Sequence, residues 1–110
     1  TQKNDLALLE NQSQEIEIQR ENFLFNQNFI EIQQRNDLEK IQNLIDKDNE
    51  LIELRKNIKT ASLAQLENGV INTNDYLREV TAEEQAILTK ITHEIQYLLT
   101  QYNLKAQLNN

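Results

Sequence analysis

The sequence contains no cysteine and no proline, and Gly69 is its only glycine. Without cysteine there are no disulfides, no thiolate zinc sites and no cysteine nucleophiles. Most turn types and sheet bulges depend on glycine or proline, so this chain has few places to reverse direction. These absences argue against a compact globular domain and favour long, uninterrupted elements.

Large core-forming side chains are also scarce. Aromatic residues make up 5% of the 110 residues, whereas fifteen asparagines and thirteen glutamines fill about a quarter of the chain. Because a globular core is built mainly from large apolar side chains, this composition disfavours a thick single core. The sequence instead predicts a thin structure that needs neighbours.

Basic residues are outnumbered, with eleven lysines and arginines against eighteen acidic residues and a formal net charge of −7. Nucleic acids and anionic membrane surfaces are therefore disfavoured as partners, because phosphate binding needs clustered basic residues. No apolar run approaches the ~18 to 20 residues of a membrane-spanning helix, and no signal-peptide pattern follows Thr1. We expect a mature or excised segment that does not itself cross a membrane by helix.

Residues 5–67 contain no helix breaker and predict one very long helix. Its apolar residues recur every seven positions in two series. One series is Leu9, Ile16, Phe23 and Ile30, and the other is Ile18, Phe25 and Ile32. The two stripes lie on nearly opposite sides, whereas a two-stranded coiled coil has a single seam. This pattern predicts a wall of helices in which each helix has a neighbour on either side.

A turn follows the long helix at residues 68–72. Asn68 can end the helix, and Gly69 can adopt the left-handed conformation after it. Asn72 can then cap a second helix with Asp75 at its third position. The sequence thus predicts an all-α fold, a long antiparallel, coiled-coil-like hairpin with a tight turn at the glycine.

The second helix should run over about residues 73–108, roughly half the length of the first. Its apolar side chains are Leu77, Val80, Ile87, Ile91 and Leu98, with Leu88, Ile95 and Tyr102 on an adjacent line. Folded back, it covers the first helix only from about residue 30 onward. Residues 1–29 then overhang with both stripes unpaired, and something else must pack on them.

Catalytic chemistry finds little support in the sequence. His93 is the only histidine, which excludes a histidine-based metal cluster, and we predict no catalytic, cofactor-binding or metal-binding residues. Neighbouring acids such as Glu83 and Glu84 have no glycine-rich loop or recognisable pocket motif beside them, so they are interpreted as solvated helix faces.

The tip of the hairpin carries two apolar side chains, Val70 and Ile71, at the end of a polar hairpin. Ile71 with Tyr76 can form a hydrophobic staple, which is a purely structural role. An exposed apolar pair at a tip also suits a docking site. Both interpretations stay open at this point.

One further pattern joins the turn to the end of the second helix. The stretch Asn68-Gly69-Val70-Ile71-Asn72-Thr73-Asn74-Asp75-Tyr76-Leu77 is followed, after eighteen intervening residues, by Gln96-Tyr97-Leu98-Leu99-Thr100-Gln101-Tyr102-Asn103-Leu104-Lys105. This combination resembles the TolC-type outer-membrane efflux channels over about residues 65–105. The first helix is similar to that family only in length, polarity and its two stripes.

The resemblance implies one long helix, the periplasmic tip and one half-length helix of a trimeric α-helical barrel in the periplasm of a Gram-negative cell. It implies passive conduction without catalysis, with membrane contact only through β-strands absent from this chain. The partners would be a periplasmic membrane-fusion adaptor and an inner-membrane pump. The residues implied for docking and gating are Gly69, Val70, Ile71, Asn72, Thr73 and Asp75.

The sequence departs from the family along the second helix, where the family usually has small or apolar residues. This chain has Glu79, Glu83, Lys90 and His93 at those positions. Two alternatives therefore stand beside the duct. One is a coiled-coil spacer or membrane-fusion adaptor hairpin that scaffolds partners, and the other is an enzyme fragment whose pocket would use Glu83 or Glu84.

Overall fold

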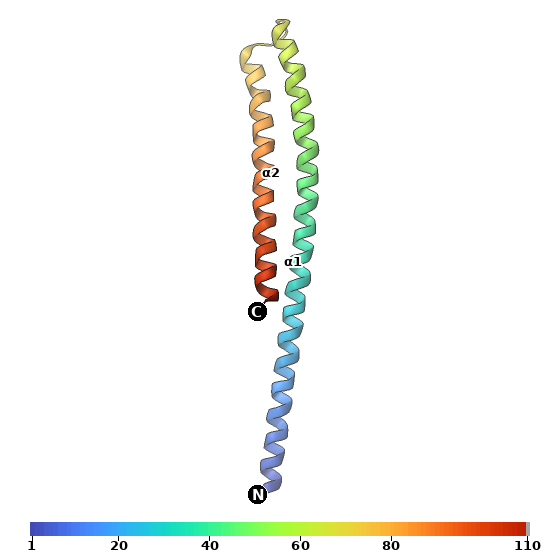
Figure 1. Cartoon of the computed structure of the whole chain (residues 1–110), viewed down its shortest axis with the longest axis vertical. Coiled ribbons are helices and arrows are strands. Elements are labelled where there is room, and N and C mark those ends of the chain that lie inside the picture. Colours follow the sequence, from blue (N-terminus) through green and yellow to red (C-terminus); the bar gives the residue numbers. More distant parts are fainter. Residues whose placement is uncertain (110) are drawn as a thin grey trace.

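The computed structural model describes residues 1–109 and contains two helices, α1 (Gln2–Glu67) and α2 (Thr73–Leu108). They run in opposite directions, side by side, and form an elongated hairpin that measures 100 × 18 × 15 Å (Figure 1). The predicted all-α antiparallel hairpin, with one long and one roughly half-length helix, is confirmed. Helix α1 begins slightly earlier than expected, because the Asp5 N–H donates to the Thr1 carbonyl and closes a first turn without a side-chain cap.

The seven-residue apolar repeat of α1 shifts by one position after Ile30, since the next member, Leu38, comes eight residues later, and the helix continues through this register change without a break. Its 66 residues account for the long axis of the molecule, since an α-helix rises about 1.5 Å per residue. The register change therefore leaves the backbone intact and alters only which side chains face α2. Leu38, Ile45 and Ile52 become half-buried against α2, whereas Leu44 and Leu51 stay exposed.

The end of α1 is closed by two backbone hydrogen bonds around the glycine. The Gly69 N–H donates to the Leu66 carbonyl at 3.1 Å, and the Val70 N–H donates to the Gln65 carbonyl at 2.8 Å. This is the Schellman arrangement, which satisfies the last carbonyls of a helix and needs a left-handed residue. Gly69 supplies that residue with φ +72°, so the reversal occurs at the sole glycine.

Replacing Gly69 should strain the turn. No heavy atom lies within 4 Å of where a Cβ would stand, so the penalty comes from the backbone conformation and not from a clash. For Gly69→Val we expect a loss of about 1 kcal/mol or more in the free energy of unfolding, measured by urea denaturation. Gly69→Asn should lose less, because asparagine tolerates the left-handed region better. Equal stability of the valine variant and the parent would contradict the assignment.

The start of α2 is capped as the sequence indicated. The Asp75 N–H donates to the Asn72 side-chain oxygen at 2.9 Å, and the Asn72 N–H donates to the Asp75 carboxylate at 3.2 Å. Together they form a capping box. Ile71 and Tyr76 on either side are half-buried, as expected for staple residues. Hydrogen bonds thus fix both the end of α1 and the start of α2 at the tip.

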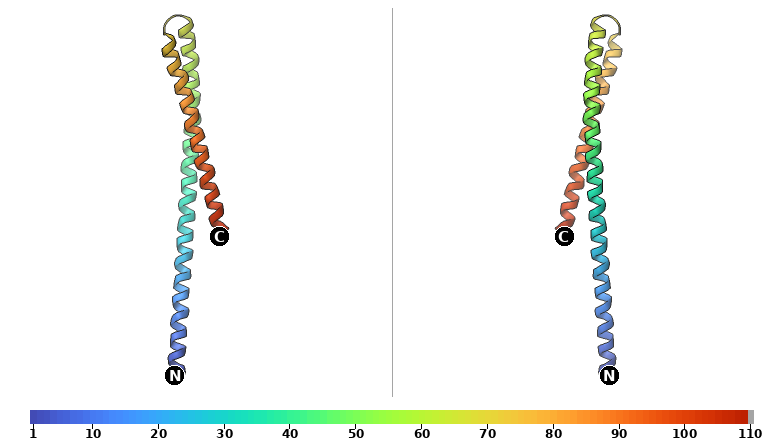
Figure 2. Two further views of the ribbon diagram at one scale, coloured as in Figure 1. Left: turned by 90° about the vertical axis from the view of Figure 1, so that its left-hand side faces the viewer. Right: turned by 90° about the vertical axis from the view of Figure 1, so that its right-hand side faces the viewer.

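Helix α2 crosses α1 obliquely and ends part of the way along it (Figure 2). Near this end the Gln107 side-chain nitrogen donates to the Gln27 side-chain oxygen at 3.4 Å. Residues 1–26, here called the overhang, are all exposed and have no α2 beside them. In the described part of the chain, neither helix contains a stretch long and apolar enough to cross a membrane.

Candidate interaction surfaces

The two helices meet along residues spaced alternately three and four apart, which is the spacing of an antiparallel coiled coil. We call these residues the seam; all are buried or half-buried. The α1 members are Gln27, Glu31, Gln34, Leu38, Ile41, Ile45, Asp48, Ile52, Arg55, Lys59, Ser62 and Leu66. The α2 members are Tyr76, Glu79, Glu83, Ala86, Lys90, His93, Tyr97, Thr100, Leu104 and Gln107. Fewer than half of them are apolar, so the hairpin has a polar interior.

Two contacts that involve a carboxylate cross the seam. His93 Nδ1 contacts the Asp48 carboxylate, whose residue is only 8% exposed. Closer to the tip, Lys59 Nζ donates to Glu83 Oε1 at 2.9 Å. Buried charges are tolerated when they are paired, and removing one partner leaves the other uncompensated. These pairs therefore favour the observed pairing of helix faces.

The polar seam also carries two buried oxygens that find no hydrogen-bond partner within the described residues, Gln34 Oε1 and Glu79 Oε2. Buried polar atoms without partners are costly. The seam is thus a weak source of stability, and the hairpin has little apolar core to offset it. Ala86 and Leu104 are the only buried hydrophobic residues in the described part of the chain.

The carboxylate of Glu83 raises the pKa of Lys59 above its ordinary value of 10.5, mainly through their hydrogen bond. Because the folded pKa lies above the unfolded one, the stabilisation is complete below the unfolded pKa and is lost as pH rises through the folded pKa. We expect the stability advantage of the parent over Glu83→Gln to be constant between about pH 7 and 9 and to shrink above about pH 10.5. Urea denaturation at each pH measures it, and an advantage that persists at high pH would contradict the pairing.

The large apolar side chains lie mainly on the outside of the hairpin. Among the described residues, twenty-five large hydrophobic side chains are exposed, eleven of them between Leu6 and Ile32. On α2 the same is true of Leu88 (57% exposed), Ile95 (52%) and Leu98 (62%). Soluble proteins rarely leave so much contiguous apolar surface in water. These faces are therefore candidate interaction surfaces.

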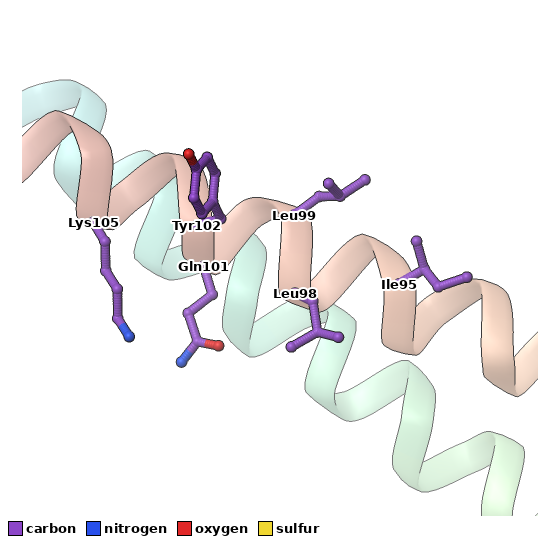
Figure 3. A pocket seen from close by; sticks show the side chains of 6 residues that line it. All are labelled: Ile95, Leu98, Leu99, Gln101, Tyr102 and Lys105. Carbon is purple, nitrogen blue, oxygen red and sulfur yellow. The ribbon is translucent and has the colours of Figure 1, made fainter.

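An open hollow of about 540 Å³ lies on this outer face near the end of α2. It is lined by Ile95, Leu98, Leu99, Gln101, Tyr102 and Lys105, all from one helix (Figure 3). In the close-up, Leu98, Gln101 and Lys105 point to one side of the helix, and Tyr102 and Leu99 point to the other. A hollow on a single helix has no second wall, so its shape suits a packed neighbour better than an enclosed small molecule.

The tip residues singled out in the sequence come together at the turn but serve different purposes there. Val70 is 69% exposed, whereas Ile71 is half-buried. Asn72 and Asp75 are occupied in the capping box, and Gly69 and Thr73 are exposed. Val70 is therefore the apolar side chain that the tip offers to a partner.

The roles of Glu79, Glu83, Lys90 and His93 did not follow from the apolar pattern of the sequence. All four belong to the seam, where Glu83 and His93 contact α1 directly. Their spacing was the available signal. With Ala86 and Tyr97 included, these residues follow one another at intervals of four, three, four, three and four, as the residues of a coiled-coil interface do. That signal was hidden because apolar residues were expected to mark the interface.

Within residues 1–109, no three His, Cys, Asp or Glu side chains come together as a metal site. Of the acid pair that an enzyme would use, Glu83 is bound to Lys59 and Glu84 is exposed. A scan against protein-family models and searches of curated proteins and of solved structures find no match to this chain.

Proposed function

We propose that this chain is a wall segment of a TolC-type outer-membrane efflux duct. In this role several copies of the hairpin, three in the complete channel, stand side by side in the periplasm and enclose a water-filled passage. Substrates delivered by an inner-membrane pump cross it passively, and no reaction is catalysed. The observation that carries the proposal is the distribution of side chains, because more than half of the seam residues are polar while most large apolar side chains lie outside.

This distribution supports a wall more than a free-standing rod. A two-helix hairpin that works alone gains most by turning its apolar stripes toward each other. Here Ile18 and Phe25 lie on one side of α1, Leu9 and Ile16 lie nearly opposite, and all four are exposed. A helix with apolar faces on both sides is stable when a neighbour covers each one, as in a closed cylinder.

Helix α2 supplies a polar face that could line such a passage. Gln85, Thr92, Gln96 and Asn103 are exposed and follow one another along α2, on the side between the seam and the apolar face that carries Leu88 and Leu99. Uncharged amides and hydroxyls keep a surface wet without strong attraction for one sign of charge. In the proposed duct these residues face water, and Leu88 and Ile95 face the adjacent hairpin.

Labelling can test this arrangement, because the sequence has no cysteine that would compete with an introduced one. Single cysteines would replace Leu88 or Ile95 on the apolar face and Gln85 or Gln96 on the polar face. In membranes that hold the assembled protein, we expect a water-soluble maleimide to react at least about tenfold more slowly on the apolar face. A bulky maleimide on the polar face should also reduce efflux.

The outcomes separate the duct from its main alternative. Protection of the apolar face together with a blocked passage supports the duct. Protection without any effect of the polar-face label favours a coiled-coil spacer or an adaptor hairpin with a scaffolding role. Equal reactivity at all four positions would mean that the hairpin stands alone in water, which would contradict both.

We also propose that the tip docks the periplasmic adaptor and closes the aperture, using Gly69, Val70, Ile71, Asn72, Thr73 and Asp75. The exposed side chain of Val70 and the rigid, doubly capped turn support this role. A fixed tip loses little conformational entropy when it binds.

For the double variant Val70→Asp and Ile71→Asp we expect weaker adaptor docking while the hairpin stays folded. The apolar contact is lost, but the backbone hydrogen bonds of the turn do not depend on these side chains. Adaptor cross-linking and efflux measure the effect, and circular dichroism checks the helix content. Asn74→Asp is the control, because it adds a charge on an exposed residue beside the tip, without loss of apolar area and outside the proposed docking residues. Unchanged cross-linking and efflux in the double variant would count against docking.

A further inference from the structure

The overhang presents a helix face whose two edges differ in charge. Its apolar line of Ile18 and Phe25 continues beyond the overhang into Phe29 and Ile32, and these four side chains are 52–70% exposed. Along one edge of this line lie Glu10, Glu17 and Glu21. Glu21 is three residues from Ile18 and four from Phe25, and Glu10 and Glu17 precede Ile18 and Phe25 by eight residues, which places them on the same edge of the helix. The other edge is mostly amide, with Asn11, Asn22 and Asn26, and carries a single acidic side chain, Glu15, against the three on the first edge.

These three glutamates are exposed, and within residues 1–109 none of them forms an ion pair. The overhang as a whole carries five acidic and two basic side chains, a formal charge of −3. Of the two basic residues, only Lys3, at the outer end, shares the acidic edge. Charge on the rim of an apolar interface selects partners of opposite charge and rejects partners of the same charge.

We infer that the overhang binds an amphipathic helix with lysine or arginine along the edge that meets Glu10, Glu17 and Glu21. The occupant has an apolar stripe on a seven-residue repeat, basic residues on one edge and uncharged polar residues on the other. It lies along the overhang and continues the layer that α2 begins. This helix is the neighbour that the proposed duct requires beside the overhang, so its assignment rests on the proposed function.

A second copy of this chain fits this face poorly. Its α2, the obvious covering element, carries five acidic and three basic side chains, and the whole chain has a net charge of −7. Two such surfaces placed together would bring like charges to the rim, which weakens association. The occupant is therefore a helix from outside residues 1–110 or from another protein.

Binding of synthetic helices to the full 110-residue chain tests the inference. Three peptides of about 28 residues would share one leucine and isoleucine heptad pattern and carry lysine, glutamine or glutamate on the same edge. By fluorescence anisotropy we expect the lysine peptide to bind at least about tenfold more tightly than the glutamate peptide at low salt, with the glutamine peptide between them. The difference should shrink as salt is added.

Charge-reversal variants locate the effect on the chain. Glu10→Lys, Glu17→Lys and Glu21→Lys together should invert the peptide preference. The matched control reverses Glu39, Asp46 and Glu53, which lie on the same side of α1 beside α2 and change the net charge equally. The control should leave the preference unchanged, and Ile18→Gln with Phe25→Gln should abolish binding of every peptide. Circular dichroism confirms that each variant is helical.

Three results would overturn the inference. They are equal binding of the lysine and glutamate peptides, no binding of any peptide, and a species of twice the 13.0 kDa chain mass that forms without peptide and is lost in the Ile18→Gln and Phe25→Gln variant. The last result would assign the overhang to a second copy. Each of them leaves the labelling test of the duct intact, because that test reads the outer face of α2 and not the overhang.

Discussion

Removing His93 should destabilise the hairpin more than any other single substitution in the seam. Asp48 is one of the most buried residues of the molecule, and the His93 ring is its contact across the seam. For His93→Ala we expect a loss of about 3 kcal/mol in the free energy of unfolding, at the low end for a broken buried pair, because water reaches this thin seam easily. Urea denaturation followed by circular dichroism measures it.

The paired replacement separates the cost of a broken pair from its net contribution. Asp48→Leu together with His93→Leu puts an apolar contact into the seam and should restore, or exceed, the stability of the parent. Glu94→Ala, an exposed neighbour on α2, should change stability by less than about 0.5 kcal/mol. If the single and paired variants were equally unstable, the contact between Asp48 and His93 would not be the cause.

The largest expected effect on function comes from charging the outer face of α2. Ile95 and Leu98 are 52% and 62% exposed and line the hollow near the end of α2. For Ile95→Asp with Leu98→Asp we expect the isolated hairpin to keep its helix content, because neither side chain is a seam residue. In cells we expect loss of the assembled species and of efflux, since each buried charge costs several kcal/mol at an apolar contact.

The control for this variant is Gln96→Asp, which adds a charge on the neighbouring polar face of the same helix turn. We expect assembly and efflux to remain close to those of the parent, because the side chain stays in water. Native gel migration of membrane extracts reports assembly, and accumulation of a fluorescent efflux substrate reports transport. An assembled, active Ile95→Asp and Leu98→Asp variant would mean that no neighbour packs against this face.

The conformation of the turn could be predicted from the local sequence alone. Gly69 adopts the left-handed conformation and Asn72 forms a capping box with Asp75, as their residue types and spacing indicated. Such features depend on contacts within a few residues, so local chemistry is enough to predict them. The same holds for the continuous α1, because good helix formers and the absence of breakers act position by position.

The seam shows where local reasoning failed. Apolar periodicity on both helices suggested where neighbours must pack, yet it did not reveal that polar residues such as Glu83, Lys90 and His93 lie between the helices. A seven-residue apolar pattern indicates a helix face that packs against another element, but it does not identify that element. The partner of His93 lies 45 residues away in the sequence, and no local rule brings Asp48 to it.

The amino-acid sequence alone determined the two helices, the place and chemistry of the turn, and the overhang that follows from their unequal lengths. Only the tertiary structure decided which faces of α1 and α2 meet, because that choice depends on the rotation of each helix about its own axis. Rotation is fixed jointly by the geometry of the turn and by distant pairs such as Lys59 with Glu83. The apolar faces are left outside as a consequence of that choice.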